Sequence, residues 1–178
     1  MEKDIGTILR LQPLGENGVI VSWCTANKGI VRTAARSARK PGSELSGCID
    51  LFHECELVYR EAPSGSDLHS LSSATLLTPR LELRNNLTRL RLCSYMARLM
   101  LATVEHESGD SGWHTLISGA LDYVTQHPPR RAVLHHFEKR LATLHGIYTP
   151  EQSAGLCLER HFRHLPSGRS ELLAALPP

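Results

Sequence analysis

The sequence predicts an α+β protein, with an N-terminal five-stranded barrel packed on a C-terminal all-helical domain. Apolar residues alternate with a period of two from Ile5 to about Leu77, whereas after Thr78-Pro79 they recur every three to four residues. The chain of 178 residues is long enough to bury an ordinary core. These observations place a barrel domain at residues 1–78 and a helical domain at residues 79–178.

The barrel prediction depends on short strands joined by turn residues. The first two strands, through Thr7 and Val19, are joined by a Gly- and Asn-containing turn at 14–18, which is typical of a hairpin. The remaining strands are expected at 30–37, 49–60 and 68–77. Five short strands in roughly 75 residues fit a barrel of the OB type. Periodicity alone would equally allow an SH3-like barrel or half of a sandwich.

The helical prediction depends on caps and apolar stripes. Thr78 is a candidate N-cap for a long first helix that runs to Val104, and Asp110-Ser111-Gly112 is expected to begin a second, which ends before Pro128. A third is expected to stop at Gly146. Thr149 and Gln152 have capping-box spacing for a fourth helix toward residue 164, followed by a last turn or two at 170–176.

Overall composition excludes several classes of protein. The formal net charge of +2 does not indicate a nucleic-acid partner, so only local clusters of positive charge could indicate one. The five cysteines contain no CxxC pair, which favours a reduced, cytoplasmic chain without a disulfide framework or zinc ribbon. We find neither an export signal nor a stretch of apolar residues long enough to span a membrane.

The strongest candidate site is a basic segment after the third predicted strand. Arg32, Arg36, Arg39 and Lys40 fall within residues 32–40, which contain no acid. If the strand is regular, Arg32 and Arg36 share a face, while Arg39 and Lys40 lie in the next loop. Guanidinium and ammonium groups there would meet phosphates in a salt-sensitive way. The alternative is a solvated strand edge whose charged residues prevent pairing with other chains.

Two further features are candidates for binding. Phe52 is placed by alternation opposite the apolar set of its strand, where it could stack on a base, whereas Trp23 and Tyr59 are expected in the core. Arg84, Arg91 and Arg98 recur every seven residues and would form one stripe on the first helix, suited to a DNA backbone or an acidic peptide. A solvated helix face is the alternative for that stripe.

Catalytic and metal motifs are absent from the sequence. The ten histidines show no HExxH pattern, and no nucleophile elbow, phosphate-binding glycine loop or pair of catalytic carboxylates is present. We therefore expect no enzyme, no cofactor and no metal site. A hydrolase that uses the histidines is the least favoured hypothesis.

The order of several segments resembles that of a known family. Residues 6–9 and 13–17, then 27–29, then the basic stretch 34–47 follow, in that order, the pattern of the RecO family of recombination mediators. The similarity continues through 77–98 and, more weakly, through 137–148. From the resemblance we expect a shortened relative without the family's four-cysteine zinc module, because Cys157 stands alone and the chain stops at Pro178.

The resemblance implies a fold and a function. It implies an OB-fold with a helical domain, in a non-enzymatic protein of the bacterial cytoplasm and nucleoid that binds single- and double-stranded DNA, anneals strands and helps to load recombinase. RecR and the acidic tail of the single-stranded DNA-binding protein are the implied partners. Arg36, Arg39 and Lys40, with Lys28 as a weaker candidate, would contact DNA.

Departures from the family pattern weaken the basic segment. Ser37, Gly42 and Glu44 stand where relatives often have glycine, lysine and a basic residue. A protein-interaction adaptor on the same scaffold, with little affinity for DNA, is therefore the alternative function.

Overall fold

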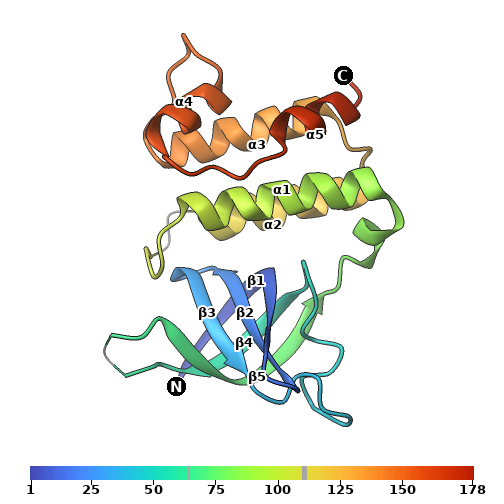
Figure 1. The fold of residues 1–178 in the computed structure, drawn as a ribbon, viewed down its shortest axis with the longest axis vertical. Helices are drawn as coiled ribbons and strands as arrows, with labels where there is room; N and C mark the ends of the chain where they lie inside the picture. The colour runs from blue at the N-terminus through green and yellow to red at the C-terminus, as the bar shows by residue number, and fades with distance from the viewer. Residues whose placement is uncertain (64, 110–111) are drawn as a thin grey trace. The chain divides into compact units, whose positions relative to one another are not determined.

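The computed structural model describes residues 1–63, 65–109 and 112–178, which form two compact units (Figure 1). The barrel unit comprises Met1–Pro79 and Glu105–His114, and the helical unit comprises Arg80–Val104 and Thr115–Pro178. The domain boundary predicted at residues 78 and 79 stays a prediction.

Five strands of the barrel unit, counted over the described residues, form a closed barrel. They are β1 (Glu2–Leu14), β2 (Gly18–Thr25), β3 (Gly29–Ala35), β4 (Glu54–Arg60) and β5 (Leu68–Thr78). Their order is β1-β2-β3-β5-β4, and β4 returns to pair with β1. β3 and β5 are parallel, while the other neighbours are antiparallel. This closed five-stranded barrel is of the OB type, and it confirms the predicted α+β fold class.

Alternating apolar residues of the strands fill the barrel. Val21, Trp23, Leu57 and Tyr59 are fully buried, as their alternation predicts. The Trp23 indole Nε1 donates a hydrogen bond to the hydroxyl of Thr33 at 2.9 Å, so the largest core side chain also has its polar atom satisfied. The predicted core positions of Trp23 and Tyr59 are therefore confirmed.

The segment between β3 and β4 is longer than the sequence predicts. The strand expected at 30–37 ends at Ala35, and the strand expected at 49–60 begins only at Glu54. Between them the chain makes successive turns, closed by backbone bonds between residues three apart. Gly42 and Gly47 supply the positive φ angles of 76° and 83° that such turns need.

The first predicted helix is wrong at its start. The chain continues β5 to Thr78, so Thr78 is no cap, and a short 3-10 helix η1 (Leu81–Asn85) precedes α1 (Leu87–Thr103). Asn86 is the N-cap of α1, because its side-chain oxygen accepts a hydrogen bond from the Arg89 amide at 3.0 Å.

The later helices follow their predicted order. They are α2 (Trp113–Gln126), α3 (Arg131–Leu144), α4 (Ala154–His161) and α5 (Arg169–Ala175). Gly146 ends α3 at a φ of 69°, as expected. Ser153, not Thr149, caps α4 by accepting a bond from the Leu156 amide. The predicted start of the second helix includes Asp110 and Ser111, which lie outside the described residues.

Candidate nucleic-acid interface

A turn directly after β3 carries the exposed cations of the basic segment. Because β3 ends at Ala35, Arg36 joins Arg39 and Lys40 in this turn, and all three side chains are exposed. Within residues 1–63, 65–109 and 112–178, no carboxylate lies within 4.0 Å of their charged nitrogens. We call Arg36, Arg39 and Lys40 the basic turn. Among the described residues, none of these three cations forms an ion pair with an acid.

The basic turn is held in place by backbone hydrogen bonds. The Lys40 amide donates to the carbonyl of Ser37 at 3.0 Å, and the Ser43 amide donates to the carbonyl of Lys40 at the same distance. The Arg39 amide donates to the carbonyl of Asn17, in the turn between β1 and β2, at 3.0 Å. The backbone is therefore ordered before any ligand arrives, which lowers the entropic cost of binding.

Lys28 and Arg32 are held by acids instead. The Lys28 ammonium lies 2.6 Å from Glu61 and 3.4 Å from Glu2. Its hydrogen bond to the Glu61 carboxylate raises the pKa of Lys28 above its ordinary value. The Arg32 guanidinium donates to Asp67 at 2.7 Å and lowers the pKa of that carboxyl. These two predicted site residues therefore differ from the basic turn in being paired.

The acids that pair with Lys28 and Arg32 were missed by sequence reasoning. Asp67 precedes β5, and the parallel register aligns Leu68 with Arg32, so the fold brings Asp67 beside Arg32 across 35 residues. No local spacing indicates this pairing, since it arises only when the barrel closes.

The prediction that Phe52 faces outward as a stacking platform is wrong. Its side chain is 1% exposed, and its backbone adopts a φ of 68°. Alternation from Ile49 predicts an outward side chain, but residue 52 lies in a turn before β4, and the Phe52 amide donates to the carbonyl of Ile8 at 2.9 Å. The ring is thus inside the protein and cannot stack on a base.

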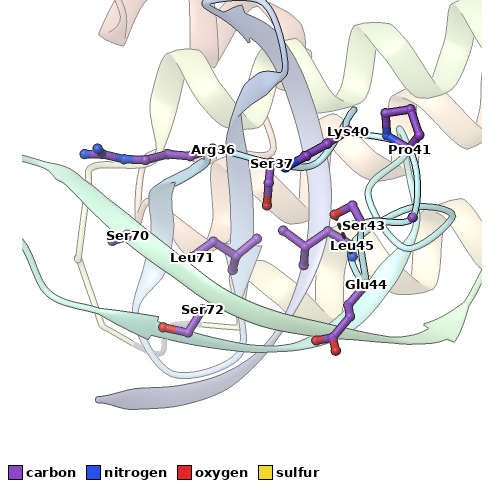
Figure 2. A pocket seen from close by; sticks show the side chains of 11 residues that line it. Arg36, Ser37, Lys40, Pro41, Ser43, Glu44, Leu45, Ser70, Leu71 and Ser72 are labelled. Carbon is purple, nitrogen blue, oxygen red and sulfur yellow. Dashed lines mark hydrogen bonds between the residues drawn. The ribbon is translucent and has the colours of Figure 1, made fainter.

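A hollow of about 560 Å³ lies beside the basic turn (Figure 2). Arg36 and Lys40 contribute to its lining from the turn, and Leu71 from β5. Figure 2 shows Leu71 and Leu45 pointing toward each other, with the Ser37 hydroxyl directed toward them. The hollow therefore combines cationic, hydroxyl and apolar surfaces within the barrel unit.

The stripe predicted on the first helix is broken. Arg84 belongs to η1, whereas Arg91 and Arg98 lie on α1. All three are exposed, and the Arg98 guanidinium lies 5.7 Å from the centre of the Tyr95 ring. Arg91 and Arg98 remain seven residues apart on one helix, while the extended backbone at Asn86 separates Arg84 from that helix.

Histidines of the barrel unit contact carboxylates. His69 lies 3.1 Å from Glu107, and His114 lies 3.2 Å from Glu54. Over the part of the chain that the structure describes, no group of three or more His, Cys, Asp or Glu side chains is arranged to hold a metal ion. Over the same part, no helix combines the length and apolar character needed to cross a bilayer.

The fold and these surfaces define a class of protein and then a family. The chain is an OB-type barrel protein with a basic turn after its third strand and a helical unit. The family model described as "Recombination protein O N terminal" matches residues 1–80. Residues 1–80 are therefore similar to the N-terminal part of the RecO family.

Several curated relatives, each called DNA repair protein RecO, extend the similarity beyond the barrel. The relative from Cyanothece sp. is 34% identical over 143 residues, covering 76% of this chain and 48% of its own length. That from Anaeromyxobacter sp. (strain K) is 34% identical over 134 residues, covering 75% and 52%. A relative from Gloeobacter violaceus is 29% identical over 158 residues, covering 88% and 56%. The chain spans about half the length of the curated relatives it matches.

Proposed function

We propose that this chain binds single- and double-stranded DNA through its phosphates, at the basic turn, and acts in DNA repair and recombination. The observation that carries the proposal is the contrast in charge compensation around β3. Arg36, Arg39 and Lys40 are exposed and form no ion pair among the described residues, whereas Lys28 and Arg32 are paired. Unpaired cations on an ordered backbone suit a sequence-independent contact with phosphates.

The proposed action is non-enzymatic and takes place at the nucleoid of the bacterial cytoplasm. Cations that neutralise phosphates reduce the repulsion between two strands, which favours annealing. The chain would also assist recombinase loading, with RecR and the acidic tail of the single-stranded DNA-binding protein as partners. Arg91 and Arg98 on α1 offer an exposed cationic face for such a tail.

The salt dependence of binding tests the basic turn. We expect the affinity for a fluorescent oligonucleotide, measured by anisotropy, to fall steeply as salt rises. The triple substitution Arg36→Ala, Arg39→Ala and Lys40→Ala removes up to three phosphate contacts. It should flatten the slope of log K against log salt by about 2, because each contact to a single strand contributes roughly 0.7.

A matched triple variant controls for net charge. Arg130, Arg140 and Arg163 are exposed residues of the helical unit, and among the described residues none has an ion pair. Changing these three to Ala lowers the charge by the same amount and should change the slope less. If the parent and the basic-turn variant bind the oligonucleotide with equal affinity at every salt concentration, the proposal is contradicted.

A protein-interaction adaptor is the second candidate function. Glu44 lies next to the basic turn in the lining of the hollow, and Lys28 and Arg32 are already neutralised, so the cationic surface is small. Pull-down from nuclease-treated lysate separates the two functions. Partner capture that persists without nucleic acid favours the adaptor, whereas capture that is lost after nuclease favours DNA binding.

A further inference from the structure

The hollow beside the basic turn has a composition that a phosphate site alone does not require. Its lining includes the cationic residues Arg36 and Lys40, the acidic residue Glu44, and Leu45 and Leu71, which are 7% and 8% exposed. A volume of about 560 Å³ is within the range of small-ligand sites. A ligand that uses all three surfaces carries a negative group, a flat apolar part and a hydrogen-bond donor.

We propose that the hollow holds one unpaired base of single-stranded DNA, with the flanking phosphates on Arg36 and Lys40. This inference rests on the proposed DNA binding at the basic turn and adds a reason for the protein to distinguish single strands from duplex. A paired base is stacked between its neighbours and cannot enter a hollow, whereas an unpaired base can.

The apolar surface of the hollow replaces the missing aromatic platform. Leu45 and Leu71 belong to the core cluster of the barrel and are 7% and 8% exposed, so the core behind them fixes the small apolar surface that they present. Phe52, the aromatic residue expected to stack, is buried. An aliphatic surface can cover one face of a base, and desolvation of that face favours binding.

Glu44 gives the hollow a preference among bases. Its side chain is exposed, and within the described residues it forms no ion pair. A carboxylate accepts a hydrogen bond from the exocyclic amino group of cytosine, but thymine offers no amino group. Glu44 therefore favours cytosine over thymine, and the acid that weakens the positive charge of this segment contributes to reading the base.

Filling the hollow without changing charge tests the inference. Ser37 is exposed in the turn and lines the hollow, so Ser37→Leu occupies the space while every cation stays. We expect the affinity for a fifteen-nucleotide oligo-dC strand to fall about tenfold, with duplex affinity within roughly twofold and an unchanged salt slope. Ser46→Leu is the matched control, because Ser46 is an exposed serine of the same segment outside the lining.

A second substitution that fills the hollow, made on β5, is needed in case Ser37→Leu alters the conformation of the basic turn. Ser70→Leu, on β5, should give the same selective loss, and Ser73→Leu, exposed on the same strand outside the lining, should not. Circular dichroism of each variant checks that the barrel is folded. Unchanged single-strand affinity in both filling variants, or an equal loss for single strands and duplex, overturns the inference.

Base preference tests the role of Glu44. Glu44→Ala should lower the ratio of oligo-dC to oligo-dT affinity by roughly fivefold or more, and an unchanged ratio overturns the assignment. The failure of the proposed function has a different signature, because the basic-turn variant would then bind both kinds of DNA as the parent does.

Discussion

The ion pairs of Lys28 and Arg32 in the barrel unit differ from the Arg169–Glu138 pair of the helical unit in the burial of their acids. In the barrel unit, Lys28 and Arg32 meet their acids at the surface, where Glu61 and Asp67 are each 52% exposed. In the helical unit, Arg169 donates two bonds, at 2.6 and 2.7 Å, to Glu138, whose side chain is only 2% exposed.

This difference separates charges that stabilise the fold from charges that are available for binding. A surface pair contributes little to stability because water screens it. A buried carboxylate, in contrast, depends on its partner, since removal of that partner leaves an unsolvated charge. The barrel unit can therefore change its surface cations at little structural cost, whereas Arg169 is structural.

The largest expected effect comes from the buried pair. Arg169→Ala leaves Glu138 buried without its partner and should lower the free energy of unfolding by about 3–5 kcal/mol, measured by urea denaturation. Arg163→Ala, an exposed position of the same unit, should change it by less than about 0.5 kcal/mol. Similar values for the two variants would remove the distinction between the units.

A smaller effect on stability is expected at the surface pair of the barrel. Asp67→Ala should cost about 0–1 kcal/mol and, by freeing Arg32, should steepen the salt slope for single-stranded DNA by roughly 0.7. Glu151→Ala in the helical unit, which removes the same charge from an exposed position, is the control. A slope that stays the same in Asp67→Ala would show that Arg32 does not reach DNA even when unpaired.

Acid should act on the same pair as the substitution does. The hydrogen bond from Arg32 lowers the pKa of Asp67 in the folded protein. The contribution of the pair is therefore present above the ordinary carboxyl pKa and is lost as the pH falls through the lowered value.

The smallest expected effect on stability at neutral pH comes from the buried thiols. Their chemical modification can show whether the barrel unit and the helical unit unfold separately. Burial raises the pKa of Cys24 and Cys55 in the barrel, and of Cys93 on α1, to about 12. These thiols should resist iodoacetamide at pH 8 until their unit unfolds, as mass spectrometry after pulses in increasing urea would measure. Because the raised values favour the protonated, folded state, stability should fall as the pH rises from about 9 toward 12.

Labelling of Cys24, Cys55 and Cys93 at the same urea concentration would indicate one cooperative unit. Labelling of Cys93 at a different concentration from the other two would show that the barrel and helical units unfold separately. Rapid modification of all three thiols in the native protein would contradict their burial.

Local patterns predicted the barrel because its core depends on alternation. Val21 and Trp23 on β2 are buried as their spacing indicates, and Leu57 and Tyr59 on β4 follow the same rule. The ends of strands were harder to predict, since they depend on where barrel closure stops the pairing. Arg36 was placed on a strand and Phe52 on an outward face for this reason, although both lie in turns.

At the start of α1, the structure differs from the prediction even though the sequence contains a local signal for the helix boundary. Asn86 is a preferred N-cap type, but the apolar residues around it continue across the break and suggest a single helix. The pairing of Arg32 with Asp67 had no local signal at all, because it follows from the parallel contact between β3 and β5. The cations of the candidate site were therefore predictable, but their pairing was not.

The hydrogen bond from the Arg39 amide to the Asn17 carbonyl couples the lengths of two turns that are separate in the chain. A residue inserted into the turn between β1 and β2 would move this carbonyl and release the basic turn without altering any cation. For the design of chimaeras, the two turns therefore form one transplantable module. A basic turn grafted onto another barrel without its hairpin turn would carry the charge but not its orientation.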